Sequence, residues 1–163
     1  MATSQIATTP GDASAPTPSM LRSATRARAV GHVAVAILAA AFAFHLYWTL
    51  GGEWGAVTAY GSTDLPPRGV VAVVTLLIAA AALLVACRIS ALAARLPAGL
   101  LRWGPWLLVG AFALVGLGNL TAPADSYARD WHIFFFGPLL LILAALCAVV
   151  ARSPVPGSRS RRL

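Results

Sequence analysis

The sequence predicts an all-α fold: a polytopic membrane four-helix bundle with both termini in the cytoplasm (N-in/C-in). Of the 163 residues, 59% are hydrophobic and only 10% are charged. The mean hydropathy of +0.79 is far above that of a soluble domain. The charged residues separate four long apolar segments, and arginines gather in every second connection. A chain of this length leaves room for one bundle and for no additional soluble catalytic domain.

The two ends of the chain are polar. Residues 1–21 consist largely of Ser, Thr, Ala and Pro, a composition that buries too little apolar surface to order itself. We therefore expect a disordered tail over 1–21, a four-helix transmembrane domain over 22–152, and a basic disordered tail over 153–163.

The four uncharged segments have lengths of 24, 19, 22 and 19 residues. A helix rises about 1.5 Å per residue, so about 20 residues cross a hydrocarbon core about 30 Å thick. Each segment is therefore long enough for one crossing. The expected spans are about 29–51, 69–88, 103–121 and 133–151. The first is too long, and begins too far along the chain, for a typical cleaved signal peptide.

The distribution of arginine predicts which side of the membrane each connection faces. All 12 basic residues are arginines: three lie in 22–28, three in 88–102 and four after residue 151, whereas the other two connections hold one each and are acidic on balance. Arginine-rich connections stay on the cytoplasmic side. We therefore expect a multi-pass protein of the cell inner (plasma) membrane, with cytoplasmic termini and outward-facing acidic connections. Arginines scattered in this way also argue against nucleic acid as a partner.

Polar side chains gather at the expected outer end of the bundle. His45 lies about two turns below the outer end of the first span, and Trp48 and Thr49 follow at i+3 and i+4 on the same helical face. A carboxylate beside a histidine at a membrane surface could act as an acid/base pair. The candidate outer polar site comprises His45, Trp48, Thr49, Glu53, Asn119, Asp130 and His132. The alternative is that His45 bonds a backbone carbonyl or Asn119 and that the loop charges are merely solvated.

The sequence gives little support to a metal or a cofactor. Cys87 and Cys147 form neither a CxxC pair nor a metal cluster. Haem held between paired histidines needs facing ligands. His32 and His45 lie near opposite ends of one helix, and His132 is expected about 10 Å nearer the surface than His45. We expect no cofactor and no metal.

Two short motifs resemble those of a family of small four-helix bacterial membrane proteins that is known only as a domain of unknown function. The first is HLYWTLGG, residues 45–52, at the end of the first span. The second is Ala128-Arg129-Asp130 followed by Gly137-Pro138-Leu139, at the start of the fourth. The resemblance covers about residues 29–150 and implies the same topology in a bacterial inner membrane. Because the family has no established activity, it supplies no catalytic residues.

We expect a non-enzymatic membrane protein whose outer polar site contacts a lipid, a small ligand or a partner. Besides the lipid bilayer, that partner is a second membrane protein or another copy of the chain in a homo-oligomer. No Asp, Glu, Lys or Arg lies inside an expected span, which argues against a proton-coupled transporter. The alternative is a membrane enzyme acting on a lipid-soluble substrate, with His45 and either Asp130 or His132 as acid and base. No catalytic residue is assigned.

Overall fold

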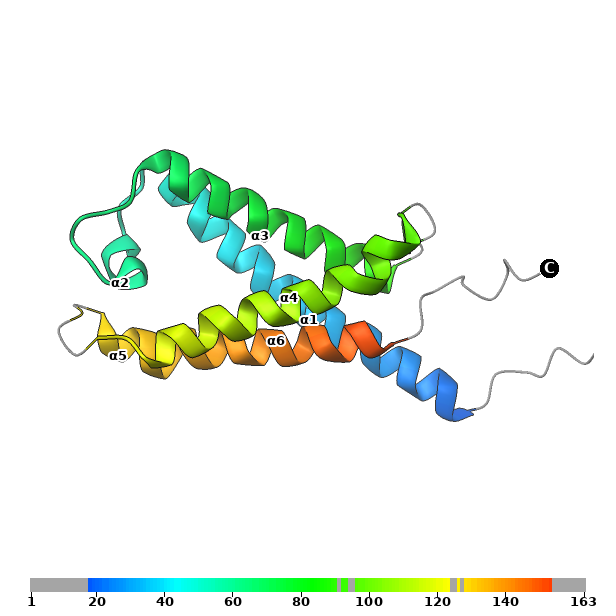
Figure 1. Cartoon of the computed structure of the whole chain (residues 1–163). Helices are drawn as coiled ribbons and strands as arrows, with labels where there is room; N and C mark the ends of the chain where they lie inside the picture. Colours follow the sequence, from blue (N-terminus) through cyan, green and yellow to red (C-terminus); the bar gives the residue numbers. More distant parts are fainter. Residues whose placement is uncertain (1–17, 91, 94–95, 124–125, 127, 154–163) are drawn as a thin grey trace, which may run out of the picture.

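The computed structural model describes residues 18–90, 92–93, 96–123, 126 and 128–153, and these form an all-helical fold (Figure 1). The elements are α1 (Pro18–Thr49), α2 (Ala56–Tyr60), α3 (Arg68–Ile89), α4 (Ala98–Leu120), α5 (Arg129–Trp131), the π-helical segment η2 (His132–Phe136) and α6 (Gly137–Arg152). No strand occurs in the residues described. The all-α prediction is therefore confirmed over this part of the chain.

Four helical segments are long and apolar enough to cross a membrane, as a multi-pass membrane protein requires. They are Leu21–Thr49, Arg68–Ile89, Ala98–Leu120 and Arg129–Arg152. Each of them overlaps one of the four expected segments, and the first, third and fourth begin earlier than expected. The first helix begins at Pro18, so residues 18–21, which were expected in the disordered tail, belong to α1. Alanine and arginine are strong helix formers, so the helix continues beyond its apolar part. The remainder of both expected tails, 1–17 and 154–163, lies outside the described residues.

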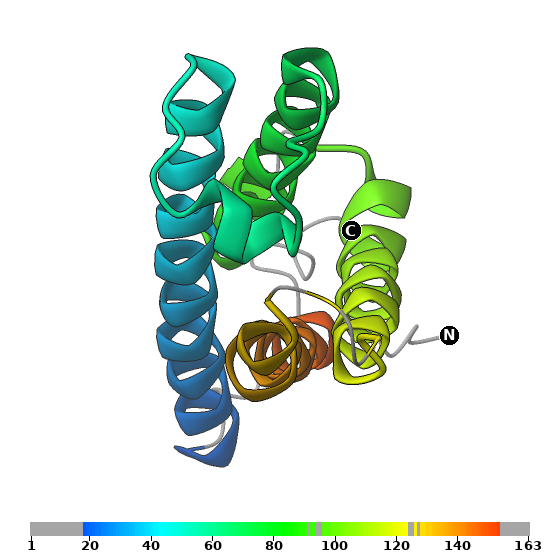
Figure 2. The same cartoon turned by 90° about the vertical axis from the view of Figure 1, so that its left-hand side faces the viewer.

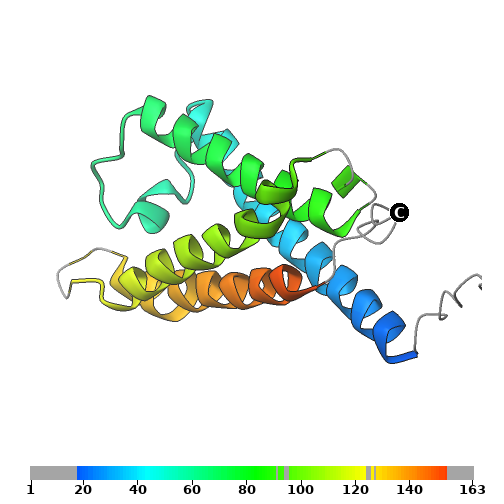
Figure 3. The ribbon, with the colours of Figure 1, turned by 45° about the vertical axis from the view of Figure 1, so that its right-hand side comes forward.

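The four long helices form two antiparallel hairpins. α1 pairs with α3, and α4 pairs with α6; α1 also packs on α6, whereas α3 and α4 approach each other only briefly. In Figure 2, which views the bundle from one end, α2 lies in front, between the α1–α3 hairpin and the α4–α6 hairpin. Figure 3 shows the start of α1 extending past the other helices at the opposite end. We call the end with connections 50–67 and 121–128 the loop end.

A small apolar core lies where α1, α3 and α6 meet. Its buried residues are Ala34, Leu38, Ala81, Val85, Leu143 and Cys147. Leu108, Val109 and Phe112 of α4 pack against this core. Many other large apolar side chains point outward, among them Leu76 and Leu107, as expected of helices that contact lipid.

Small residues let the helices of the second hairpin approach closely. A Cβ on Gly116 of α4 would lie 3.2 Å from the carbonyl oxygen of Gly137 at the start of α6. Glycine at 116 permits this approach to the backbone of α6, and glycine at 137 leaves room for the side chain of Leu120, whose Cδ2 would lie 2.7 Å from an added Cβ. The contact fixes how α4 and α6 align, and so which of their polar residues meet at the loop end.

The fourth span begins with a widened turn, η2, directly before Pro138. Proline has no N–H, and its ring crowds the carbonyl four residues earlier, so regular α-helical bonding cannot continue through it. The N–H of Gly137 instead donates to the carbonyl of His132, five residues back. His132, whose carbonyl accepts this π-helical bond, is the first residue of η2. Such single π turns often occur at functional sites.

Candidate functional site

The connection after α1 folds back onto the helix that precedes it. Gly51 has a φ of +101°, a left-handed conformation that glycine adopts without a Cβ clash. Its N–H donates to the carbonyl of Trp48, and the N–H of Gly52 donates to that of Tyr47, each at 3.0 Å. The indole Nε1 of Trp48 then donates to the carbonyl of Trp54 at 2.9 Å. These bonds hold the connection against Trp48.

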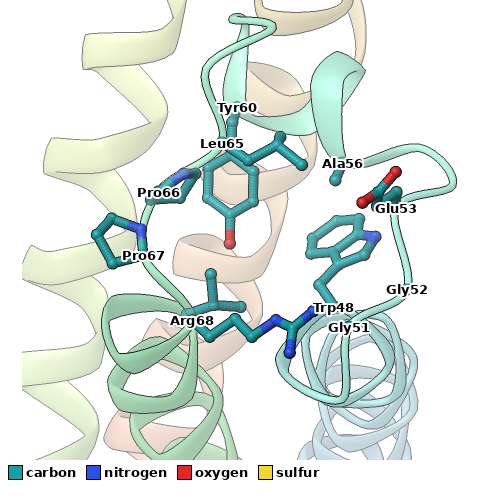
Figure 4. A pocket seen from close by; sticks show the side chains of 11 residues that line it. Trp48, Gly51, Gly52, Glu53, Ala56, Tyr60, Leu65, Pro66, Pro67 and Arg68 are labelled. Carbon is teal, nitrogen blue, oxygen red and sulfur yellow. The ribbon is translucent and has the colours of Figure 1, made fainter.

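A pocket of about 280 Å³ lies between the end of α1, helix α2 and the start of α3 (Figure 4). It is lined by Trp48 and residues 51–53, by Ala56 and Tyr60 of α2, and by residues 65–68 and Val71 around the start of α3. Gly55 and Gly61, both at positive φ, bound α2 and let the chain change direction at each end. The first hairpin and its connection therefore build the pocket by themselves.

The phenol of Tyr60 lies in the pocket wall with an unpaired hydroxyl. Its ring lies 5.6 Å from the ring of Trp48, measured between centroids. Its hydroxyl oxygen is buried and has no hydrogen-bond partner among the described residues. Burial raises the pKa of Tyr60 above its ordinary value of 10.0, because the phenolate form would be poorly solvated. The pocket thus contains a polar group whose hydrogen-bonding capacity is unused.

Two opposite charges flank the indole of Trp48. Figure 4 shows the indole lying between the carboxylate of Glu53 and the guanidinium of Arg68. The guanidinium lies against Gly51, where an added Cβ would be 2.9 Å from Nη2. This position is at the C-terminal end of α1, where helix carbonyls favour a positive charge. The pocket can therefore receive an anionic group on one side of an aromatic ring and a cationic group on the other.

His45 lies next to the pocket but is bonded within its own helix. Its Nδ1 lies 2.8 Å from the carbonyl oxygen of Ala41, and its ring meets that of Trp48 edge-on, with centroids 4.9 Å apart. The hydroxyl of Thr49 donates to the carbonyl of His45 at 2.8 Å and lies 3.0 Å from the hydroxyl of Thr75 on α3. His45 and Thr49 therefore support the helix end that carries Trp48.

Asn119 and His132 pair with each other on the second hairpin. Nδ2 of Asn119 donates to the carbonyl of Val115 at 3.0 Å, which leaves its Oδ1 to accept a hydrogen bond from Nδ1 of His132. His132 then carries its proton on Nδ1 and a lone pair on Nε2. Nε2 is buried without a partner among the described residues. It lies beside Gly61, where an added Cβ would be 3.2 Å away, so the pair adjoins the C-terminal end of α2.

The predicted site residues therefore occupy separate places at the loop end. Trp48 and Glu53 line the pocket, His45 and Thr49 lie behind it, Asn119 pairs with His132, and Asp130 is exposed on a shallow depression with Trp131, Phe134 and Phe135. Within the described residues, no hydrogen bond joins His45 to Asp130 or to His132: Nδ1 of His45 bonds Ala41 and Nδ1 of His132 bonds Asn119.

Tyr60 and Arg68 are absent from the site expected from the sequence, although both line the pocket. In the sequence, Arg68 cannot be distinguished from the other charged residues of the connections. Tyr60 belongs to α2, which has only five residues and is too short for a helical pattern of apolar residues to be recognised. Two signals could have found them: the glycines at 55 and 61 that frame α2, and the Pro66-Pro67 pair that brings the chain to Arg68.

A family model described as "Protein of unknown function (DUF3995)" matches residues 36–147. The matched range holds every residue that lines the pocket, together with Asn119 and His132. No curated protein and no solved structure gives a significant match. Function therefore has to be argued from the pocket and from the groups around it.

Proposed function

We propose that this chain, which belongs to the DUF3995 family of proteins of unknown function, is a non-enzymatic membrane protein that binds a small ligand in the pocket beside Trp48. The observation that carries the proposal is the hydroxyl of Tyr60, which is buried in the pocket wall with no partner among the described residues. An unpaired buried polar group costs about 1–3 kcal/mol. A ligand atom that pairs with this hydroxyl removes that cost.

The composition of the pocket supports the same function. Small-molecule sites are concave and mostly apolar, and they carry a few fixed polar groups. Trp48 and Val71 supply apolar surface here, while Tyr60, Glu53 and Arg68 supply polar groups. The volume of about 280 Å³ is just below the usual range, which begins at about 300 Å³. It suits a small molecule or a lipid headgroup.

We further propose that the loop end faces away from the cytoplasm, across the inner membrane of a bacterial cell. The support is the charge distribution. The two connections at the loop end are acidic on balance, whereas the three arginine-rich segments, 22–28, 88–102 and the chain after residue 151, adjoin the span ends on the opposite side. In this orientation the ligand reaches the pocket from the outer face of the membrane.

Native mass spectrometry of the full chain, released from a mild detergent, tests ligand binding. The parent protein is expected to retain a molecule from its own membrane, and Trp48→Leu is expected to lower the bound fraction about tenfold, because a central aromatic ring supplies much of such a contact. Tyr60→Phe should lower it as well. Trp103→Leu, an exposed tryptophan near the start of α4 at the opposite end of the bundle, and Tyr47→Phe, which keeps its ring, are matched controls, since neither side chain lines the pocket. Equal occupancy in all these variants would contradict the proposal.

One observation favours a second candidate, a membrane enzyme that acts on a lipid-soluble substrate. Because Asn119 holds the proton on Nδ1 of His132, the unpaired Nε2 can accept a proton as a general base does. In this alternative the base is His132, because its Nε2 is the one that is buried without a partner among the described residues; Nδ1 of His45 is held by the carbonyl of Ala41 in the same way that Asn119 holds Nδ1 of His132. The purified chain, incubated with a lipid extract of its own membrane, would then form products that His132→Gln abolishes. Absence of products, or products that persist in the variant, rules the enzyme out.

A further inference from the structure

We infer that the pocket beside Trp48 takes a zwitterion: a phospholipid headgroup that combines a phosphate with a primary ammonium group, as in phosphatidylethanolamine. The inference rests on the proposed function and adds the chemical class of the ligand. It starts from the placement of two opposite charges, Glu53 and Arg68, on either side of one indole (Figure 4).

The side of the pocket at Arg68 suits a phosphate. Arg68 holds its guanidinium against Gly51, at the end of α1, and a guanidinium binds phosphate oxygens through parallel N–H groups. Figure 4 shows the hydroxyl of Tyr60 pointing toward the start of α3, where Arg68 lies. That hydroxyl has no partner among the described residues. It can therefore donate to one of the two non-bridging phosphate oxygens, which has a further lone pair free beside the guanidinium contact.

The side at Glu53 suits an ammonium group. The carboxylate of Glu53 is exposed at the pocket rim, and a primary ammonium can donate hydrogen bonds to it. The face of an indole also attracts a cation, most strongly where water is excluded. The ring of Trp48 is only 8% exposed. A quaternary ammonium has no N–H group, so it would lose the hydrogen bonds to Glu53.

The surroundings of the pocket favour a zwitterion that is attached to a lipid. The rings of Trp54 and Tyr47 are exposed beside it, and Trp and Tyr are enriched at the depth of membrane headgroups. From the pocket toward the middle of the bundle, α1 and α3 expose apolar side chains that include Leu46, Val70 and Val73. Acyl chains of a lipid whose headgroup occupies the pocket can lie along this apolar surface.

An anionic phospholipid provides the decisive comparison. Phosphatidylglycerol offers a phosphate to Arg68 but no cation to Glu53, so it forgoes the charge-assisted hydrogen bonds that an ammonium group makes with this carboxylate. The pocket should therefore prefer phosphatidylethanolamine to phosphatidylglycerol with the same acyl chains. One charge-assisted hydrogen bond corresponds to a preference of about tenfold.

The experiment measures the thermal midpoint of the full chain in detergent, by tryptophan fluorescence, while each lipid is added in turn. Ligand that binds only the folded chain raises the midpoint by an amount that grows with the logarithm of the ligand concentration divided by its Kd, so the tighter lipid gives the larger shift at equal concentration. We expect the parent protein to bind phosphatidylethanolamine about tenfold more tightly than phosphatidylglycerol. Glu53→Gln should remove the preference, and Arg68→Gln should weaken both lipids. Free phosphoethanolamine should give no shift at concentrations where the lipid saturates.

Two variants serve as matched controls for these charges. Asp64 is an acid in the same connection, but it does not line the pocket, and its N–H bonds the hydroxyl of Ser62 at 3.0 Å. Arg129 is an exposed arginine at the loop end, also outside the lining. Asp64→Asn and Arg129→Gln should both keep the parent preference. Loss of the preference in either control would show that net loop charge, and not the pocket, selects the lipid.

The possible failures are distinguishable. Equal binding of the two lipids, unchanged by Glu53→Gln, overturns the inference that the ligand is a zwitterion. A loss of lipid binding in Trp48→Leu would in that case still support a ligand site in the pocket. Equal affinity for free phosphoethanolamine and for the lipid overturns the lipid attachment. If the binding of no probe depends on Trp48 or Tyr60, both the inference and the proposed function are wrong.

Discussion

The rings of Trp48 and Tyr60 lie 5.6 Å apart between centroids and are inclined by 58°. Trp48 belongs to the last turn of α1, and Tyr60 is the last residue of α2, so this contact joins a membrane-spanning helix to the short helix in its connection. The indole N–H of Trp48 is bonded to the carbonyl of Trp54. Of the two rings, it is therefore Tyr60 that offers an unused polar group to a ligand.

Tyr60 is expected to make the fold sensitive to high pH. Because burial raises its pKa above 10.0 in the folded chain, the unfolded chain loses the phenol proton at a lower pH. Above about pH 10 the folded state then binds more protons than the unfolded state, and stability falls as the pH rises. The thermal midpoint in detergent should decline over this range, and Tyr60→Phe should make the decline shallower. Tyr47→Phe is the control; the same decline in Tyr60→Phe as in the parent would contradict the assignment.

Gly51→Ala is expected to destabilise the fold by about 1–2 kcal/mol, because an L residue at a φ of +101° is strained. The added Cβ would also lie 2.9 Å from Nη2 of Arg68 and displace the guanidinium. Gly69→Ala, at a helical position with open space around it, should be neutral or slightly stabilising. Unfolding by denaturant in detergent measures both, and equal effects would show that the left-handed turn is not needed.

Arg88 joins the two hairpins at the end of the bundle opposite the loop end. Its Nη2 donates to the carbonyls of Ala151 at 3.2 Å and Ser153 at 2.8 Å, at the end of α6. Arg88→Ala leaves these carbonyls unpaired and opens a cavity around a side chain that is only 4% exposed, at an expected cost of about 2–4 kcal/mol. Arg102→Ala, which removes an exposed guanidinium from the ring of Trp103, should cost about 1 kcal/mol or less. A similar loss for both variants in denaturant unfolding would contradict this role.

The orientation in the membrane can be tested with single cysteines in intact cells. Ser62→Cys, in the first connection at the loop end, should react with a membrane-impermeant thiol reagent, whereas Ser158→Cys should react only after the membrane is opened. The native thiols of Cys87 and Cys147 are buried and should give little background. Reversed labelling would place the loop end in the cytoplasm.

The four long helices are predictable from sequence because each apolar segment is long and is bounded by charge. The start of α1 is not predictable in this way. Ser19, Leu21 and the arginines that follow are compatible with either a polar coil or a helix that extends beyond the apolar part, and composition does not distinguish the two. The structure makes these residues helical from Pro18 onward.

The candidate site is predictable only where proximity is local. Trp48 and Glu53 are close in the chain, so their common place at the end of α1 follows from helix geometry. The pairing of Asn119 with His132 depends instead on how α4 and α6 align at Gly116 and Gly137, and on the wide turn before Pro138. That alignment is a tertiary feature that helical periodicity does not contain.

The position of Tyr60 depends on the path of a whole connection. Gly51, Gly55 and Gly61 all adopt positive φ, and together they turn the chain so that α2 lies over the end of α1. A sequence reading finds glycines in this connection but not the direction in which each one turns the chain. For this reason the residue with the unpaired hydroxyl was not among the expected site residues.

The most direct test of ligand binding in the pocket is the protection of a cysteine placed in its wall. Leu65 lines the pocket, whereas Thr63, two residues earlier, is exposed and lies outside the lining. The two variants Leu65→Cys and Thr63→Cys therefore place a thiol inside and outside the pocket. Each purified variant would be treated with a small neutral maleimide in detergent, with and without a lipid extract of its own membrane. The account predicts that the extract slows the reaction of Leu65→Cys several-fold and leaves that of Thr63→Cys unchanged. Equal rates for Leu65→Cys with and without the extract would contradict a ligand in this pocket.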